Sequence, residues 1–479
     1  MKKHHGTNAQ YGLDAMCYFH HEEEGRFARI FKTLSPFYMN PCVIDELTKV
    51  GGPMDSEGVK QSATLPVGFV FLGQFIDHDV TLDTTSRLDR NNDPMATRNF
   101  RTPSLDLDCI YGAGPEASPH LYQADGIKLH TGATSTAYTG YSSANLKNHD
   151  LSRTSNGTAI IGDPRNDENR AISQLQLAFI NFHNCVADHV YEEKQKEYEK
   201  KGCKGKVEIE FEEVRKLVTW HYQWIILHEF LPAFVGQPLV DEILCKGRKI
   251  YLPKSKKKGF IPIEFAAAAY RFGHSMVPLN LRFQKNGASN PLFGKTYGIG
   301  FTPLPSKKAI VDWDVLFGCG YRNFERADKL DTKLATDLLQ LPFIQPPGDN
   351  NLARRNLLRG QSFLLPSGEE VAGHLEGCGI KTRYPRVKKE ILTPIFKKLN
   401  HTGCTPLWFY ILAEAQLLTK GQRLGPVGGR IVAETLIGLM ELDSTSFLGE
   451  NRQWTPTLGP KKTCSFTMCD LLHFCSPKK

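Results

Sequence analysis

The stretch "LPVGFVFLGQFIDHDVTL", residues 65–82, contains three consecutive ionisable residues, Asp77, His78 and Asp79, among mostly apolar ones. On a helix, Gln74, Asp77 and His78 stand at positions i, i+3 and i+4 and share one face, while Asp79 points elsewhere. Burying three such groups is costly unless each has a strong partner. The stretch therefore predicts a core helix with one polar face toward a cavity and with Asp79 bound to a cation. The alternative is an ordinary core helix in which these groups satisfy one another by hydrogen bonds.

The segment "TPSLDLDCIYG", residues 102–112, offers further ligands beside Asp79. It alternates oxygen-bearing residues with proline and leucine, and in an extended strand the oxygen-bearing set points to one side. That set is Thr102, Ser104, Asp106 and Asp108. Such a row of oxygen groups suits Ca²⁺, a hard cation that binds oxygen ligands. The pattern predicts a calcium site completed by Asp79, with an exposed strand face as the alternative.

Helical periodicity recurs along the chain and indicates a mainly α fold with few short strands. Further helices are predicted over residues 169–201, from 211 to a stop at Pro232, and over 263–276, 332–341 and 428–442. No long linker rich in Pro, Gly or Ser interrupts these segments. Residues 25–479 are therefore predicted to form one large domain, preceded by a polar segment over residues 1–24.

Composition narrows the class of protein. A hydrophobic content of 41% and a charged content of 23% are typical of globular proteins, and no apolar run is long enough for a transmembrane segment. The N-terminal stretch lacks the apolar core of a secretory signal peptide, so a cytoplasmic or non-classically exported protein is expected. The net charge of +8 is mild, and its densest lysine cluster, residues 253–259, is predicted to be a solvated loop. Nucleic-acid binding is not expected.

The twelve cysteines include no C-x-x-C pair, which disfavours a zinc ribbon or a redox dithiol. Without a signal peptide, free thiols are the expectation. Sequons for N-glycosylation at Asn156 and Asn400 matter only if the chain is exported.

Several segments match motifs of other enzyme classes only in part. "GAGPEA", residues 112–117, fits a dinucleotide-binding fingerprint, but Pro115 and Pro119 prevent the helix that would hold a pyrophosphate. "GKT", residues 294–296, lacks the preceding glycine of a P-loop, and neither H-E-x-x-H nor G-x-S-x-G occurs. Nucleotide-binding, zinc-protease and esterase functions are disfavoured.

Five motifs, taken together and in order, resemble those of the animal-type haem peroxidases, the peroxidase–cyclooxygenase superfamily. They are "GQFIDHD", "TPSLDLDCIYG", "GDPRNDE", "YRFGHS" and "NNLARRNLLRGQSFLLPSGEE". The last resembles most the compact members, including bacterial ones, and the similarity spans roughly residues 25 to 475. The resemblance implies a large, mainly α, single-domain fold around haem b.

The resemblance also implies roles for individual residues. His78 matches the distal histidine, Gln74 its neighbour, Arg165 the distal arginine and His274 the proximal iron ligand. Asp77 and Glu168 match the carboxylates that form ester bonds to haem in covalently linked members. Asp79, Thr102, Ser104 (through its carbonyl), Asp106 and Asp108 match the calcium ligands.

Three departures from the family pattern refine the expectation. Asn169 stands where the chloride-oxidising leukocyte enzyme has the methionine of a sulfonium link, which disfavours chloride oxidation. The register of the Leu-Pro run makes Glu369 the expected hydrogen-bond partner of His274, where relatives have asparagine. Arg271, with Tyr270 one position off, stands where cyclooxygenase-type relatives have a radical tyrosine.

The function implied by the resemblance is reduction of hydrogen peroxide and oxidation of small organic or halide-like donors through a high-valent iron-oxo intermediate. The proposed acid–base group is His78, because an imidazole titrates near neutrality. Two alternatives stay open: an enzyme acting on fatty acids or their hydroperoxides, and a catalytically silent scaffold that keeps the fold.

Overall fold

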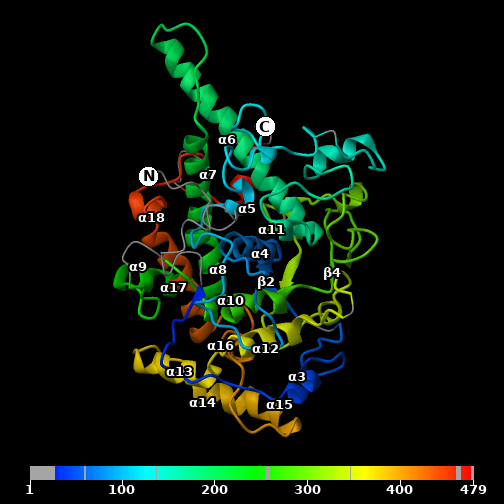
Figure 1. Ribbon diagram of the computed structural model, residues 1–479, viewed down its shortest axis with the longest axis vertical. Coiled ribbons are helices and arrows are strands. Elements are labelled where there is room, and N and C mark those ends of the chain that lie inside the picture. The colour runs from blue at the N-terminus through cyan, green and yellow to red at the C-terminus, as the bar shows by residue number, and fades with distance from the viewer. Residues whose placement is uncertain are drawn as a thin grey trace.

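Helix α4 (Gly68–Val80) lies at the centre of a mainly α structure, seen in Figure 1. The computed structural model describes residues 27–58, 61–135, 137–254, 259–345, 347–459 and 465–475. The predicted segment 1–24 and most of the lysine cluster lie outside the described residues. Within them, the apolar side chains form one continuous core that extends from Phe27 to Leu471.

The predicted helix of the central stretch is confirmed, and its apolar face explains its position. The ring of Phe75 stacks on Phe179 with centroids 4.4 Å apart. At the helix start, a Cβ on Gly68 would lie 2.5 Å from the ring of Phe317, so only glycine permits this close approach. The helix is thus buried around most of its circumference, which explains its nearly continuous apolar sequence.

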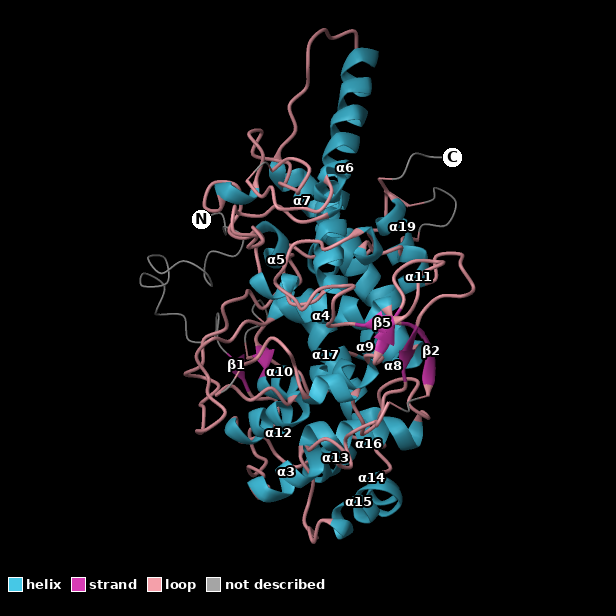
Figure 2. Ribbon diagram, turned by 90° about the vertical axis from the view of Figure 1, so that its right-hand side faces the viewer, coloured by secondary structure: helices cyan, strands magenta, loops and turns pink. Residues whose placement is uncertain are grey.

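Two long helices pack against one another and extend the molecule, as Figures 1 and 2 show. Helix α6 (Arg170–Lys200) is buried in its first half and leaves the core in its second, where the apolar periodicity fades into charge. Asn169 caps its first turn by accepting a hydrogen bond from the backbone N–H of Ile172 at 3.0 Å. Helix α7 (Phe211–Ile225) returns along it.

Two predicted helices differ from the expectation. The helix that begins at Phe211 does not stop at Pro232: a π turn, η4 (Ile226–Phe230), leads into α8 (Leu231–Val235). The wider turn accommodates the proline because Pro232 lies in the first turn of α8, where its missing N–H costs little. The segment 263–276 is two elements, α10 (Ile263–Ala267) and the 3₁₀ helix η5 (Ala269–Met276), separated by the non-helical backbone of Ala268.

The remaining helices surround this centre. The larger ones are α3 (Pro41–Thr48), α9 (Gln237–Lys246), α12 (Leu352–Ser362), α13 (Gly368–Gly377), α15 (Thr393–Lys398), α16 (Leu407–Leu418), α17 (Pro426–Leu442) and α19 (Met468–His473). The short ones are α5 (Asp108–Tyr111), α11 (Trp313–Phe317), α14 (Tyr384–Val387), α18 (Phe447–Glu450), η1 (Pro119–Leu121), η2 (Ala144–His149), η3 (Pro164–Asp167), η6 (Lys307–Ala309), η7 (Thr336–Leu339) and η8 (Lys388–Leu392). The helix predicted over 332–341 is reduced to η7, because Ala335 is extended.

Strands are few and short, as predicted. Strand β1 (Phe27–Ala28) pairs in parallel with β3 (Ile261–Pro262). The antiparallel pairs are β2 (Ser62–Pro66) with β6 (Arg326–Asp328) and β4 (Asn280–Leu281) with β5 (Asn290–Pro291). Among the described residues, no helix is both long and apolar enough to cross a membrane.

Two disulfides attach the C-terminal segment, so the expectation of free thiols throughout was wrong. Cys475 is bonded to Cys185 of α6, and Cys469 of α19 is bonded to Cys319. The paired cysteines are 290 and 150 residues apart in sequence, and only the packing of α19 on α6 and α11 brings them together. Such long-range contacts leave no signal in cysteine spacing.

Candidate functional site

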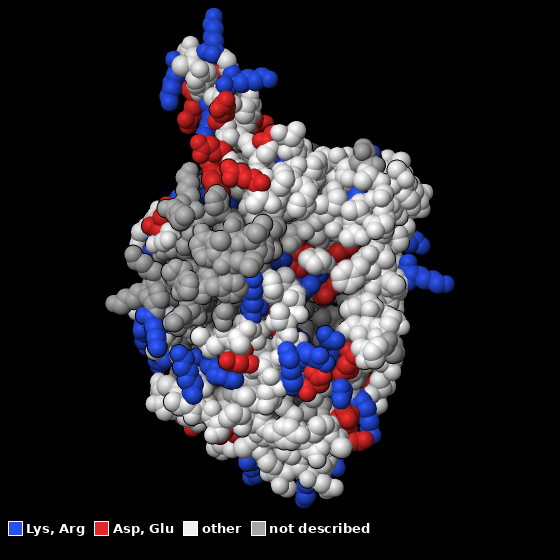
Figure 3. Space-filling model, viewed as in Figure 1, with Lys and Arg blue, Asp and Glu red and all other residues white. Residues whose placement is uncertain are grey.

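A cavity of about 320 Å³ lies between α4, the start of α6, η5 and α12. It is lined by six of the seven residues predicted for the haem site, all but Glu369: Gln74, Asp77, His78, Arg165, Glu168 and His274. Figure 3 shows the face of the molecule seen in Figure 1, which is hollowed near its centre, where acidic and basic side chains gather. The structure thus brings together side chains that are far apart in sequence, from Gln74 to His274.

A chain of hydrogen bonds fixes the imidazole of His78, which is 5% exposed. Its Nδ1 lies 2.7 Å from Oδ1 of Asn166. The amide of Asn166 donates to Oε1 of Gln176 at 2.7 Å, and Gln176 donates to the carbonyl of Cys109 at 3.1 Å. Because the amide oxygen of Asn166 can only accept, Nδ1 carries the proton and Nε2 holds a lone pair. Burial, and then the charge of Arg165, lowers the pKa of His78 to about 3, so the ring is neutral.

Asn166 and Gln176 are functional residues that the sequence did not reveal. Asn166 lies inside "GDPRNDE", but its role depends on the approach of η3 to α4. Gln176 stands among apolar residues of α6 and is fully buried. A buried amide needs hydrogen-bond partners, so an amide among apolar residues was the one sign in the sequence of its role.

Arg165 spans the gap between η3 and the end of α4. Its Nη2 donates to the carbonyls of His78, at 3.2 Å, and of Thr81. Its Nε and Nη2 bind the carboxylate of Asp163 at 3.1 and 2.7 Å. Although burial opposes it, Arg165 together with Arg101 holds the pKa of Asp163 well below its usual range. Asp163 therefore stays ionised and anchors the guanidinium at the edge of the cavity.

Gln74 links the helix to the second predicted carboxylate. Its Nε2 donates to Oε1 of Glu168, and its Oε1 accepts from Nδ2 of Asn169 at 3.1 Å. Burial raises the pKa of Glu168 to about 7. Burial also raises the pKa of Asp77, despite the nearby charges of Arg165 and Arg271. Both residues are half-buried at the cavity wall.

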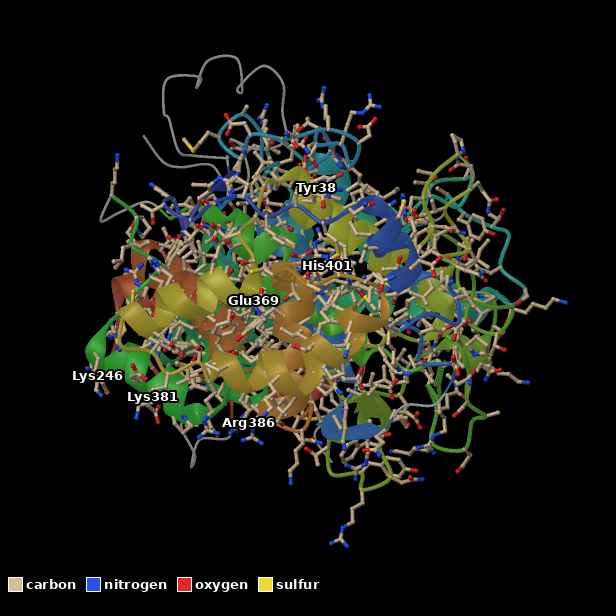
Figure 4. The ribbon with its side chains drawn as sticks, turned by 90° about the horizontal axis from the view of Figure 1, so that it is seen from below. Tyr38, Lys246, Glu369, Lys381, Arg386 and His401 are labelled. Atoms are coloured by element: carbon tan, nitrogen blue, oxygen red, sulfur yellow. A yellow bond between two sulfur atoms is a disulfide. The ribbon has the colours of Figure 1, made fainter. Side chains whose placement is uncertain are left out.

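The partner of His274 is Asn356, and the prediction of Glu369 was wrong. Nδ2 of Asn356 lies 2.8 Å from Nδ1 of His274. Glu369 instead accepts hydrogen bonds from the backbone N–H and hydroxyl of Thr405, at 2.8 and 3.0 Å. Figure 4 shows Glu369 among the helices at the lower end of the molecule. The physical reason is the left-handed backbone of Leu364 (φ 53°), which turns the chain between α12 and α13 and carries Glu369 away from the cavity.

The rest of the lining combines apolar walls with arginines. The apolar part includes Phe71, Phe234, Phe272, Leu292, Phe293 and Phe343, and the arginines besides Arg165 are Arg271, Arg355 and Arg359. Apolar walls suit the faces of a flat aromatic macrocycle, arginines suit its carboxylate edge, and the Nε2 of a histidine held at Nδ1 suits its metal. The donor set therefore fits haem.

Three of the predicted calcium ligands form a cluster next to His78. Carboxylate oxygens of Asp79, Asp106 and Asp108 all lie within 4.8 Å of one another. Oδ1 of Asp79 is buried without a hydrogen-bond partner in the described part of the chain, and Oδ1 of Asp108 forms a buried ion pair with Nη1 of Arg101 at 3.4 Å. Burial, and then Asp106, raises the pKa of Asp79 to about 8. A divalent cation among these oxygens would satisfy Oδ1 of Asp79 and bind the other carboxylates beside it.

The predicted strand face over this segment was wrong, although its residues do meet. Residues 102–107 form bends rather than a strand, and the hydroxyl of Thr102 donates to Oδ1 of Asp106 at 2.9 Å. In a strand these two residues would stand roughly 13 Å apart. The segment forms a curled loop, which also holds Ser104, because Leu107 adopts a left-handed conformation (φ 61°) just before α5.

Comparisons with known sequences bear on this site. Residues 84–360 match the family model described as animal haem peroxidase. Dual oxidase from Drosophila melanogaster is 29% identical over 214 residues, or 43% of this chain and 13% of that protein. Dual oxidase 1 from Caenorhabditis elegans is 28% identical over 128 residues, or 27% of this chain and 8% of that protein. The chain thus spans less than a sixth of the length of these relatives.

Solved structures share the fold. Peroxidase A from Dictyostelium discoideum superposes with a TM-score of 0.59 at 16% identity and covers 91% of this chain and 92% of its own. A fatty acid alpha-dioxygenase from Arabidopsis thaliana superposes with a TM-score of 0.58 at 16% identity, covering 90% of this chain and 74% of its own. The predicted fold class is confirmed.

Proposed function

Because the chain belongs to the animal haem peroxidase family, as its five motifs predicted, we propose that it binds haem b and reduces hydrogen peroxide while oxidising small organic or halide-like donors. The observation that carries the proposal is the single cavity that brings His78 and Arg165 together with His274. When bound, the haem would supply the redox chemistry, by storing oxidising equivalents that a donor later removes. The protein would supply ligation, proton transfer and charge stabilisation.

His274 would bind the iron through Nε2. Its Nδ1 is engaged by Asn356, which fixes the ring and leaves the other nitrogen for a metal. For Nε2 to hold the iron, the amide of Asn356 would have to turn so that its oxygen accepts the Nδ1 proton. The bond that this oxygen now accepts from Nη1 of Arg271 at 3.3 Å would then be lost. Burial, and then Arg271, lowers the pKa of His274 to about 3, which keeps the ring neutral and able to act as a ligand.

His78 would move the proton during peroxide cleavage. Its Nε2 would take a proton from the inner peroxide oxygen and return it to the departing outer oxygen. Arg165, anchored by Asp163, would stabilise the negative charge that develops as the O–O bond breaks.

Asp77 and Glu168 would form ester bonds to the haem. Both carboxyl groups line the cavity, and each is held by one neighbour: Asp77 by the hydroxyl of Thr81 at 3.2 Å, and Glu168 by Gln74. If these ester bonds form, we expect the haem to stay with the protein during extraction with acidified butanone. Complete extraction of the haem would contradict them.

Replacing Asn356 by alanine is expected to lower haem affinity or peroxidase activity by about 10–100-fold, the usual effect of removing the partner of a ligating histidine. Haem titration of the apoprotein and the Soret band would measure it. Glu369→Gln is the matched control, because Glu369 binds Thr405 outside the cavity. An effect of Glu369→Gln as large as that of Asn356→Ala would contradict the assignment.

A second candidate function, oxidation of fatty acids or their hydroperoxides, is favoured by one observation. Tyr270 lines the cavity, and its buried hydroxyl makes no hydrogen bond to the described residues. Arg271, at the position of the radical tyrosine in cyclooxygenase-type relatives, binds the carbonyl of Ala266 and Asn356 instead. Arg271 therefore counts against a cyclooxygenase-type radical site, whereas Tyr270 is the residue that supports the second function.

Turnover assays separate the two functions. Purified haem-loaded protein is expected to oxidise guaiacol only when hydrogen peroxide is added, and to leave linoleate unchanged without peroxide. Oxygenated linoleate that disappears in Tyr270→Phe would support the second function. Absence of peroxide-driven guaiacol and iodide oxidation by protein with a normal Soret band would refute the first.

Calcium is proposed as a second cofactor, bound by Asp79, Thr102, Ser104, Asp106 and Asp108. The close cluster of Asp79, Asp106 and Asp108 and the buried Oδ1 of Asp79, which has no hydrogen bond to the described residues, support it. We also propose an oxidising compartment, since disulfides persist there and the sequons at Asn156 and Asn400 are exposed. Finding Cys319 and Cys469 reduced in protein isolated under thiol-blocking conditions would contradict that location.

A further inference from the structure

The disulfide between Cys319 and Cys469 is surrounded by further metal-ligating groups, none of which lines the central cavity. Cys469 and His473 stand at positions i and i+4 of α19 and therefore share a face. Ligand atoms of Asp314, Cys319 and His473 all lie within 4.8 Å of one another. Figure 2 shows α19 beside α11, the helix that carries Asp314. The helices α11 and α19, with the segment just after α11 that carries Cys319, thus gather two sulfurs, an imidazole and a carboxylate.

The carboxylate and the imidazole are placed to accept an ion. Oδ2 of Asp314 is held by Nζ of Lys285 at 2.6 Å. The other oxygen, Oδ1, is buried without a hydrogen bond to the described residues and faces Nε2 of His473 at 3.2 Å. His473 is 47% exposed, and an open hollow lined by Cys319, Cys469 and His473 connects the group to solvent.

We propose that Cys319, Cys469, His473 and Asp314 bind Zn²⁺ when the disulfide is reduced. Two thiolates, one imidazole and one carboxylate are ligand types that zinc takes in tetrahedral sites. The sulfur ligands also distinguish this site from the all-oxygen cluster at Asp79, which suits calcium. The proposal does not depend on the haem chemistry.

Reduction would replace the disulfide crosslink by a zinc crosslink. A thiol or phosphine reductant gives two electrons to the disulfide, two protons are taken up, and two cysteine thiols form. Zinc then displaces the two thiol protons and binds the thiolates, while Nε2 of neutral His473 and Oδ1 of Asp314 complete the shell. The link between α19 and the segment after α11 is therefore kept in both redox states.

The second disulfide provides a matched comparison. Cys185 and Cys475 also tether the C-terminal segment, but in the described part of the chain they belong to no group of three His, Cys, Asp or Glu side chains whose ligand atoms lie within 4.8 Å of one another. Reduction of that bond should leave two ordinary thiols.

The test is a zinc count on the holoprotein, kept in excess calcium. Oxidised and phosphine-reduced samples are incubated with ZnCl₂ under argon, desalted and measured for zinc per chain by elemental analysis. We expect one more zinc per chain in the reduced sample than in the oxidised one. His473→Ala, which keeps both disulfides and hence the oxidised fold, should lose that zinc. So should the pair Cys319→Ser and Cys469→Ser, while the pair Cys185→Ser and Cys475→Ser should retain it.

Alkylation gives a second readout. Zinc should protect Cys319 and Cys469, but not Cys185 and Cys475, from iodoacetamide, as followed by peptide mass spectrometry. Equal zinc content in the reduced and oxidised samples would overturn the proposal. So would zinc that survives in His473→Ala and in the Cys319/Cys469 double variant.

Discussion

Replacing His78 by alanine is expected to slow the reaction with hydrogen peroxide by about 10²–10⁴-fold, the usual contribution of a general acid–base group. The haem should remain bound, because the proposed iron ligand is His274. Stopped-flow measurement of the Soret change after peroxide addition, expressed per haem, would check the rate. The loss follows from the neutral imidazole, whose unprotonated Nε2 is fixed by the hydrogen bond between Nδ1 and Asn166.

His183→Ala is the matched control for this variant. His183 is also a fully buried histidine, but it binds the hydroxyl of Tyr111 and the carbonyl of Ile127 and does not line the cavity. Its replacement should change stability and leave the peroxide rate per haem unchanged. Equal rates in the His78→Ala and parent proteins would rule out acid–base catalysis by His78.

Removing calcium is expected to lower the free energy of unfolding by on the order of 4 kcal/mol, for calcium held at about 1,000 times its dissociation constant. Without the cation, the carboxyl groups of Asp79, Asp106 and Asp108 lie within 4.8 Å of one another, and burial together with Asp106 raises the pKa of Asp79 to about 8. The folded state would then have to take up protons or hold like charges in a buried site. Denaturant unfolding in calcium and after chelation would measure the loss. The Soret band should change as well, because Asp79 adjoins His78.

Asp108→Asn should reproduce part of this loss and weaken the response to chelation, while Asp89→Asn serves as control. Asp89 is exposed and pairs with Arg87 outside the cluster. If unfolding and the Soret band are the same with calcium verified absent, the cluster binds no structural calcium.

Predictions from the sequence were most successful where the relative positions of the residues depend only on the local secondary structure of one segment. The face shared by Gln74, Asp77 and His78 could be predicted because helical spacing alone determines it. The family motifs then placed Arg165 and His274 correctly at the cavity. Neither step required knowledge of how distant segments pack.

The wrong predictions concern contacts between segments that are far apart in sequence, where the path of the chain between them decides which residues meet. Asn356 lies within the quoted motif, yet Glu369 was selected from its register after the Leu-Pro run, and the turn at Leu364 sends the two residues to different places. The pairings of Cys319 and Cys475 likewise depend on where α19 packs. Asn166 and Gln176 act through contacts with α4 and α5 that no local pattern encodes.

The hydrogen-bond chain that begins at Nδ1 of His78 has a consequence for proton transfer. It ends at the carbonyl of Cys109, and a backbone carbonyl cannot relay a proton onward. A proton captured by Nε2 therefore has no exit along this hydrogen-bond chain, and we expect it to return to the peroxide on the cavity side of the ring. Breaking the peroxide bond should therefore be neutral overall, with no acid drawn from or released to the buffer, which a pH indicator dye in weakly buffered solution would register as a flat trace.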